Sequence, residues 1–243
     1  MGEDSQQSRR PWARPLLRLM PMRAWLALER ELRLAGTRAG NAVLPGRRRA
    51  RSAWRGARGL KLNLGCGAHV LEGWVNVDAV RRPGVDLAQD LRRPLPLDDG
   101  SASLVFSHHV LEHLHYPDEA LALLRECRRV LEPDGWLRVV VPDLDFYARS
   151  YTDGPEGHAR LREMVGVTAP LDTPAEALNQ GLRLGEGHLF AYDAETLAGL
   201  LRLAGFSRVE RSAFRQSGLG PELARDREQP WFQLESLYME ARP

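Results

Sequence analysis

Two short apolar runs are each followed by residues that suit the binding of a ligand. The run at residues 60–64 ends in Gly65-Cys66-Gly67, and the run at residues 74–77 ends in Asp78. In an open parallel sheet, ligands bind beyond the carboxyl ends of the strands, and glycines there let the backbone approach them. An acid that ends the next strand can accept hydrogen bonds from both hydroxyls of a ribose. The pattern therefore predicts a site for a nucleoside.

The spacing of these residues disfavours a nicotinamide dinucleotide. That fingerprint needs a third glycine, which would fall at Val70, and an acid about 20 residues further on. Asp78 comes only 11 residues after Gly67. Cys66, inside the glycine loop, is interpreted as a small residue that fills a tight turn rather than as a reactive thiol.

Histidines are the candidate bases. Four of them follow the apolar run at residues 104–106, at positions 108, 109, 113 and 115. His188 follows a glycine-rich turn, and Asp143 ends the apolar run at residues 137–141. Imidazole titrates near neutrality, which suits a general base. We take His188 and His109 as candidate bases and Asp143 as a further catalytic candidate.

Glu112 and His113, with His109 four residues before His113, also raise the question of a metal. A metal site needs three or four converging ligands, and the sequence shows no further spaced set. The prediction is therefore that no metal is bound.

The elements that must position these residues alternate between apolar strands and helices or tight turns, which predicts a mostly parallel α/β sheet. Further strands are predicted at residues 85–87, 104–106 and 137–141, and helices at 117–131 and after Asp193. The last two strand candidates, residues 207–214 and 232–240, are expected to pair antiparallel.

The chain divides into an arm and a main domain. Residues 1–58 form an extension, residues 59–243 form the domain, and residues 143–190 are interpreted as an insertion on the substrate side with one helix near 157–165. Residues 1–60 hold 14 arginines and four acids, whereas the rest holds 20 basic and 28 acidic residues. Helical periodicity at residues 22–34 allows three interpretations: a helix packed on the domain, a loose basic extension, or a helix on anionic lipid.

The compartment follows from cysteine usage and hydropathy. Two cysteines make no disulfide framework, so a reducing compartment fits best. No run approaches the ~20 apolar residues of a membrane span. Arginines interrupt every N-terminal apolar stretch, so no secretory signal is expected and a cytoplasmic location is predicted.

The motifs from residue 60 onward resemble those of class I S-adenosylmethionine-dependent methyltransferases. They include LNLGCG at residues 62–67, GWVNVD at 73–78, SHHVLEH at 107–113 and RVLEPDG at 129–135, and the likeness covers about residues 60–241. It is nearest to a bacterial subgroup, methyltransferase type 11-like, whose first helix is abbreviated and whose members often accompany glycan-building enzymes. The resemblance implies a doubly wound, mostly parallel, seven-stranded Rossmann-like sheet with an insertion before the C-terminal strands.

The resemblance also implies S-adenosylmethionine as the cofactor and assigns residues to it. Gly65, Cys66 and Gly67 would pass under its amino-acid and ribose parts, and Asp78 would hold the ribose hydroxyls. The remaining cofactor residues are Asp90 at the adenine amine, Leu91 against the ring, and Ser107 and His108 along the pocket wall.

The implied function is methyl transfer to a small-molecule or saccharide acceptor, at a hydroxyl. The preference for a hydroxyl oxygen as the acceptor atom follows from the histidines and from the association of the subgroup with glycan-building enzymes. One alternative is an RNA-modifying or RNA-binding protein that uses the basic arm, although the acidic main domain makes nucleic acid an unfavoured partner. Another is a non-catalytic scaffold that binds the same cofactor and contacts a membrane surface through the arm.

Overall fold

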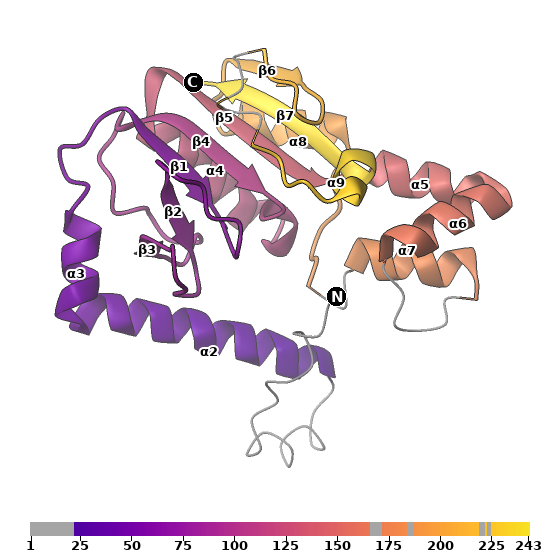
Figure 1. The fold of residues 1–243 in the computed structure, drawn as a ribbon, viewed down its shortest axis with the longest axis horizontal. Coiled ribbons are helices and arrows are strands. Elements are labelled where there is room, and N and C mark those ends of the chain that lie inside the picture. Colours follow the sequence, from indigo (N-terminus) through magenta and orange to yellow (C-terminus); the bar gives the residue numbers. More distant parts are fainter. Residues whose placement is uncertain (1–21, 166–171, 184–186, 219–221, 223–224) are drawn as a thin grey trace.

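A central sheet of seven strands organises the protein, as seen in a computed structural model that describes residues 22–165, 172–183, 187–218, 222 and 225–243. The strands lie in the order β3-β2-β1-β4-β5-β7-β6 (Figure 1). Their bounds are β1 Leu60–Leu64, β2 Val75–Asp78, β3 Leu87–Ala88, β4 Ala102–His108, β5 Leu131–Pro142, β6 Arg208–Arg211 and β7 Ser236–Arg242.

Strand pairing confirms the predicted sheet. Strand β1 pairs parallel with β2 and with β4, and β4 pairs parallel with β5. Only β7 runs antiparallel, between β5 and β6, as expected for the last two strands. Strand β7 begins later than predicted, because Pro230–Glu235 forms the short helix α9. The strands that pair parallel with one another, β1 to β5, therefore end at the same edge of the sheet.

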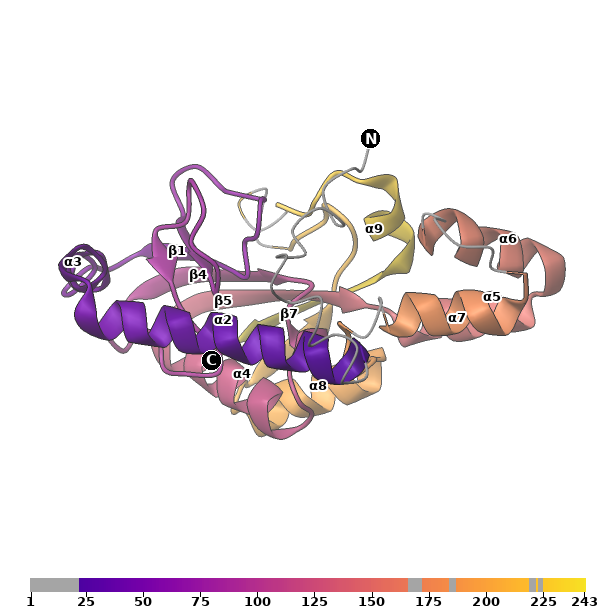
Figure 2. The ribbon, with the colours of Figure 1, turned by 90° about the horizontal axis from the view of Figure 1, so that it is seen from below.

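Helices α4 (Asp118–Val130) and α8 (Ala194–Leu203) cover one face of the sheet (Figure 2). Both were predicted. The side chain of Asp193 caps α8 by accepting a hydrogen bond from the backbone nitrogen of Thr196 at 2.8 Å. Gly205, with a φ of 100°, follows the helix in a conformation that favours glycine. The apolar faces of both helices pack on the strands to form the main core.

Coil segments at residues 212–218 and 225–229 lie over the other face and are anchored by one buried arginine. Arg138 of β5 is completely buried and makes two hydrogen bonds to Asp226, at 3.0 and 2.6 Å. It also donates to Glu240 at 2.7 Å and to the backbone oxygen of Ala213 at 2.8 Å. Arg138 lies within the apolar stretch at residues 136–141 of β5, and its hydrogen bonds attach the C-terminal coil to the sheet at this point.

The insertion contains more helix than predicted. It holds α5 (Leu144–Thr152), α6 (Gly154–Val165) and α7 (Pro174–Arg183), which pack on one another beyond the carboxyl end of β5 (Figure 1). Only α6 was expected. The start of α7 carries a capping box that is visible in the sequence, since Thr173 and Glu176 exchange hydrogen bonds between side chain and backbone.

The N-terminal arm packs on the domain rather than extending from it. Helix α2 (Met22–Val43) is longer than the predicted 22–34 and crosses the carboxyl edge near β2 and β3 (Figures 1 and 2). Thr37 and Asn41 fix it by donating to the backbone oxygens of Ala79, at 2.6 Å, and Ala88, at 2.8 Å. Helix α3 (Pro45–Ser52) turns back from its end. The polar start of the arm lies outside the described residues. In the part of the chain that the structure describes, no helix has the length and apolarity to cross a membrane.

We expect Arg138→Met to lower the free energy of unfolding by about 3–5 kcal/mol, because it leaves Asp226 and Glu240 buried without their partner. Urea unfolding followed by circular dichroism measures this loss. Arg202→Met, on the exposed side of α8, is the control and should change stability by no more than about 0.5 kcal/mol. Equal stability of the two variants would contradict the anchoring role.

Candidate functional site

The glycine loop after β1 has a backbone that larger residues would disturb. Gly65 and Gly67 have φ values of 64° and 54°, in the left-handed region. A Cβ on Gly65 would lie 2.3 Å from a methyl group of Val110, so the loop packs directly on the segment that follows β4. Both glycines are therefore required by geometry, and the loop is held against the end of the sheet.

Asp78 is held in place at the end of β2. Its Oδ2 accepts a hydrogen bond from the backbone nitrogen of Gly67 at 2.9 Å, and its Oδ1 accepts one from Val80 at 2.8 Å. The carboxylate is half-buried, and each oxygen retains a second lone pair. This arrangement fits the predicted binding of ribose hydroxyls. Cys66, between the glycines, is buried, and burial raises its pKa to about 11, which fits a space-filling thiol.

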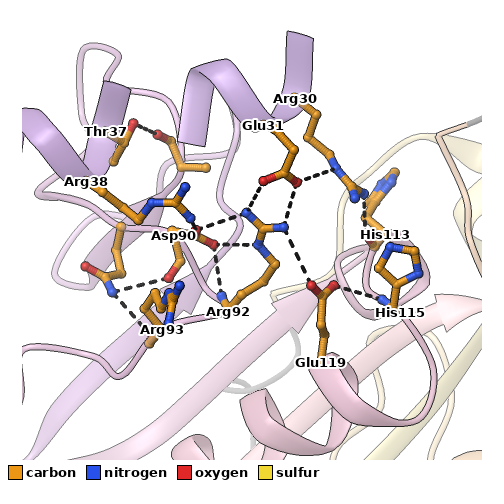
Figure 3. A network of polar contacts seen from close by, with 12 residues as sticks. Arg30, Glu31, Thr37, Arg38, Asp90, Arg92, Arg93, His113, His115 and Glu119 are labelled. Carbon is orange, nitrogen blue, oxygen red and sulfur yellow. Dashed lines mark hydrogen bonds and ion pairs between the residues drawn. The ribbon is translucent and has the colours of Figure 1, made fainter. Parts of the chain in front are cut away.

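Asp90 has partners that the sequence did not indicate. Its carboxylate accepts hydrogen bonds from Arg38 of α2 at 2.8 Å and from Arg92 at 3.1 Å, and Arg92 is also paired with Glu31 of α2 (Figure 3). Burial raises the pKa of Asp90, but hydrogen bonds and charge from Arg92 outweigh it and leave the pKa lowered. Leu91 is buried in the main core. The acid expected at adenine is thus bridged to the arm.

Ser107 and His108 end β4 as buried residues with unused polar atoms. The hydroxyl of Ser107 and both ring nitrogens of His108 have no hydrogen-bond partner. The His108 ring stacks on His109 with 4.7 Å between centroids and meets Phe232 edge-on at 4.8 Å. Burial lowers the pKa of His108, so its ring is neutral. Buried polar atoms normally have partners, so this end of β4 fits a bound ligand.

Beyond β4, three histidines surround one carboxyl group. Oxygen Oε1 of Glu112 lies 3.6 Å from Nδ1 of His109, 4.0 Å from Nε2 of His113 and 3.9 Å from Nε2 of His188. Glu112 is completely buried, and neither of its oxygens has a hydrogen-bond partner. Burial raises its pKa to about 8 and lowers that of His188 to about 4. The imidazoles of the cluster are therefore neutral at pH 7.

Backbone hydrogen bonds bring His188 to this cluster. Glu112 and His113 belong to a short 3-10 helix, η2 (Leu111–His113). The backbone nitrogen of Leu189 donates to the backbone oxygen of Glu112 at 2.6 Å. Nδ1 of His113 makes a 2.7 Å hydrogen bond with the backbone oxygen of Gly187. The end of the insertion is therefore fastened to η2 on both sides of His188.

His109 occupies a strained position. Its φ is 56°, which is uncommon for a residue other than glycine and is disfavoured by contacts of the Cβ. The backbone nitrogen donates to Val140 at 2.8 Å, and Nε2 lies 3.0 Å from the hydroxyl of Ser236. These contacts on both sides hold the imidazole where β4 ends, beside Glu112.

The histidines open onto a cavity of about 280 Å³. Its wall contains His109, His113 and His188 together with Tyr147 and Met164 of the insertion, Gln180, Gly181, Arg227, Trp231, Phe232 and Glu235. The sequence did not indicate that Arg227 and the α9 residues would line this cavity. Arg227 is partly buried, and its Nε has no hydrogen-bond partner. No periodic signal marks this coil in the sequence, so only the fold reveals it.

Asp143 lies apart from this cavity. Its Oδ1 accepts a hydrogen bond from the backbone nitrogen of Asp145 at 3.0 Å and so caps α5. Its Oδ2 lies 3.1 Å from Arg211. Of the three catalytic candidates, the structure therefore brings His109 and His188 together and gives Asp143 contacts that stabilise the start of the insertion.

Comparison with known proteins finds a family model that matches part of the chain. Residues 75–139 match the family model of a methyltransferase domain. A curated relative, an uncharacterized 37.1 kDa protein in a transposon of Streptomyces fradiae, is 39% identical over 83 residues, which are 34% of this chain and 23% of the relative. The chain thus matches about a quarter of the length of that relative.

Two solved structures are among those that are similar to this chain. An S-adenosylmethionine-dependent methyltransferase from Archaeoglobus fulgidus has a TM-score of 0.49 at 15% identity, over 87% of this chain and 94% of that one. The 1,6-didemethyltoxoflavin-N1-methyltransferase of Burkholderia thailandensis, with bound 1,6-didemethyltoxoflavin and S-adenosylhomocysteine, has a TM-score of 0.44 at 19% identity, over 92% and 90% of the two chains.

The matched segment includes β2, β3, β4 and α4, the part of the sheet that carries Asp78, Ser107 and His108. Its strands stand in the order and direction that the sequence motifs imply. Over residues 75–139 the chain therefore matches a methyltransferase domain.

Proposed function

We propose that this protein transfers the methyl group of S-adenosylmethionine to a hydroxyl of a small molecule, with a monosaccharide unit as one class of acceptor. The observation that carries the proposal is the position of the histidine-lined cavity. Gly65 of the cofactor loop packs on Val110, the residue directly after His109. The nucleoside end of the site and the cavity are therefore adjacent.

The residues at the carboxyl edge fit the cofactor. Asp78 presents two oriented oxygens for the ribose, the Gly65–Gly67 backbone leaves room beside it, and the unpartnered atoms of Ser107 and His108 can meet the remaining polar groups. Bound S-adenosylmethionine supplies an activated methyl carbon, whose bond to sulfur breaks as an acceptor oxygen bonds to that carbon, leaving S-adenosylhomocysteine.

The chain contributes position, desolvation and a proton acceptor. Holding two reactants in place accounts for roughly 7–11 kcal/mol of a barrier in favourable cases. The hydroxyl proton needs an acceptor within hydrogen-bond reach. His109 and His188 are both neutral and line the cavity, so either ring can take this proton.

The shape and lining of the cavity favour a small acceptor. A volume of about 280 Å³ lies near the lower end of ligand pockets, which span roughly 300–1,000 Å³. Trp231, Phe232 and Tyr147 supply aromatic surface on which a flat ring or a sugar packs well. The neutral imidazoles supply the polar contacts that a hydroxyl needs.

Because α2 packs on the domain, the role of the arm in membrane contact cannot be tested by deleting the arm. Deleting residues 1–58 would remove Arg38 and Thr37, which contact the domain at its carboxyl edge, and so would disturb the site itself. Leu28 and Leu32, by contrast, are 42% and 57% exposed. We propose that any membrane contact uses this side of α2, where substitutions leave the contacts with the domain intact.

We expect Asp78→Ala to weaken S-adenosylmethionine binding roughly 10- to 100-fold, because hydrogen bonds to a charged group contribute about 1.5–3 kcal/mol. Isothermal calorimetry on the full chain measures the effect. Asp134→Ala, at a carboxylate whose side chain is 89% exposed, is the control and should bind as the wild type does. Unchanged binding by Asp78→Ala would place the cofactor elsewhere.

A second substitution tests the proton acceptor. His109→Asn removes one of the two candidate bases, the one beside the end of β4, while keeping a residue that tolerates a positive φ. We expect kcat to fall about 10²- to 10⁴-fold, with S-adenosylmethionine affinity unchanged. The assay follows release of S-adenosylhomocysteine with a panel of phenols and monosaccharides, and the exposed His115→Asn serves as the control. A variant with wild-type turnover would remove His109 from the mechanism.

A further inference from the structure

We propose that Glu112, His113 and His188 bind a divalent first-row transition-metal ion. One oxygen or nitrogen of each residue lies within 4.8 Å of the others, and the two histidines of the set line the cavity. The prediction of no metal rested on the lack, in the sequence, of a further spaced ligand beyond His109, Glu112 and His113. The fold supplies that ligand from the far end of the insertion.

The ring nitrogens that face Glu112 are free to bind an ion. Nδ1 of His113 is occupied by the backbone oxygen of Gly187, which leaves the lone pair on Nε2. Nε2 of His188 is buried without a hydrogen-bond partner, while the ring also makes a hydrogen bond to the backbone of Leu182. A backbone contact on the second nitrogen is how metal-binding histidines are usually oriented.

The distances between the ligand atoms would suit a bound ion if the side chains moved slightly closer together. Ligand atoms that bind one ion at about 2.0–2.2 Å lie roughly 3.0–3.5 Å apart. Oε1 of Glu112 now lies 4.0 Å from His113 Nε2 and 3.9 Å from His188 Nε2. Glu112 is the decisive residue, because burying a carboxyl group without a hydrogen-bond partner is costly and a bound cation would provide the missing partner.

The donor set indicates the class of ion. Two imidazoles and one carboxylate suit zinc, cobalt, manganese or iron, whereas magnesium and calcium prefer oxygen ligands alone. Nδ1 of His109 lies 3.6 Å from the same oxygen of Glu112 and stands beside the three ligands. Arg227 lines the same cavity, but no ion pair joins it to Glu112 among the described residues.

Binding of the ion does not depend on the proposed function, whereas its role does. An ion with an open position toward the cavity would hold the acceptor oxygen and lower the pKa of its hydroxyl group. With His188 on the ion, His109 is the imidazole left to receive the hydroxyl proton. The oxygen would then use the freed electron pair to form its bond to the methyl carbon.

The test is a cobalt titration of the full chain after treatment with a chelator. Co²⁺ bound to imidazole and carboxylate absorbs visible light, so we expect saturable growth of absorption at one ion per chain. Zn²⁺ should displace Co²⁺ and abolish the absorption. The titration needs neither cofactor nor acceptor, and its result is therefore independent of calorimetry with S-adenosylmethionine.

Matched variants identify the ligands. Glu112→Gln keeps the shape of the side chain and His188→Gln removes an imidazole, and each should weaken Co²⁺ binding about 100-fold or more. His115→Gln, at an exposed histidine close to the cluster, should bind as the wild type does. His113→Gln provides a ligand variant at a side chain that is 40% exposed, in case Glu112→Gln does not fold.

Two results would overturn the metal site. One is the absence of saturable Co²⁺ binding by folded wild-type protein. The other is equal affinity in His113→Gln, His188→Gln and His115→Gln, which would mean that the ion binds surface histidines instead. A bound ion together with a failure to bind S-adenosylmethionine would keep the metal site and refute the proposed methyl transfer.

Discussion

The whole site depends on the parallel pairing of β1 with both of its neighbours. Leu64 stands opposite Val77 on one side and Ser107 on the other, so the three strands end at the same level. The glycine loop, Asp78 and the histidines must therefore leave the sheet at one edge. Backbone hydrogen bonds then fix their distances, since Gly67 donates to Asp78 and Gly65 packs on Val110.

A second constraint is the buried carboxyl group of Glu112. Its own backbone oxygen accepts hydrogen bonds from Leu189 and Phe190, while its side-chain oxygens face imidazoles and have no hydrogen-bond partner. Several hydrogen bonds thus hold the end of the insertion next to the side chain of Glu112, whose oxygens have no hydrogen-bond partner. A buried carboxyl group without a hydrogen-bond partner is uncommon in a well-packed interior. It is expected at a place where a bound ligand supplies the missing partner.

Much of this architecture is local and could be predicted from the sequence. The apolar strands, the glycine loop and the cap of α8 depend on neighbouring residues, so residue type and spacing suffice. The approach of His188 to Glu112 and the pairing of Arg138 with Asp226 depend on contacts between distant segments, which periodicity does not encode. Helix α7 is intermediate between these cases. Its capping box at Thr173 and Glu176 is a local signal in the sequence, although no helix was predicted there.

Helix α2 shows why an arginine-rich arm should not be treated as separate from the domain. Arg38 donates to Asp90, where adenine is expected, and Arg30 donates to the backbone oxygen of His113 at 3.1 Å (Figure 3). Eight residues of helix separate the two arginines, a span of about 12 Å. One helix therefore contacts both Asp90 and the histidine cluster.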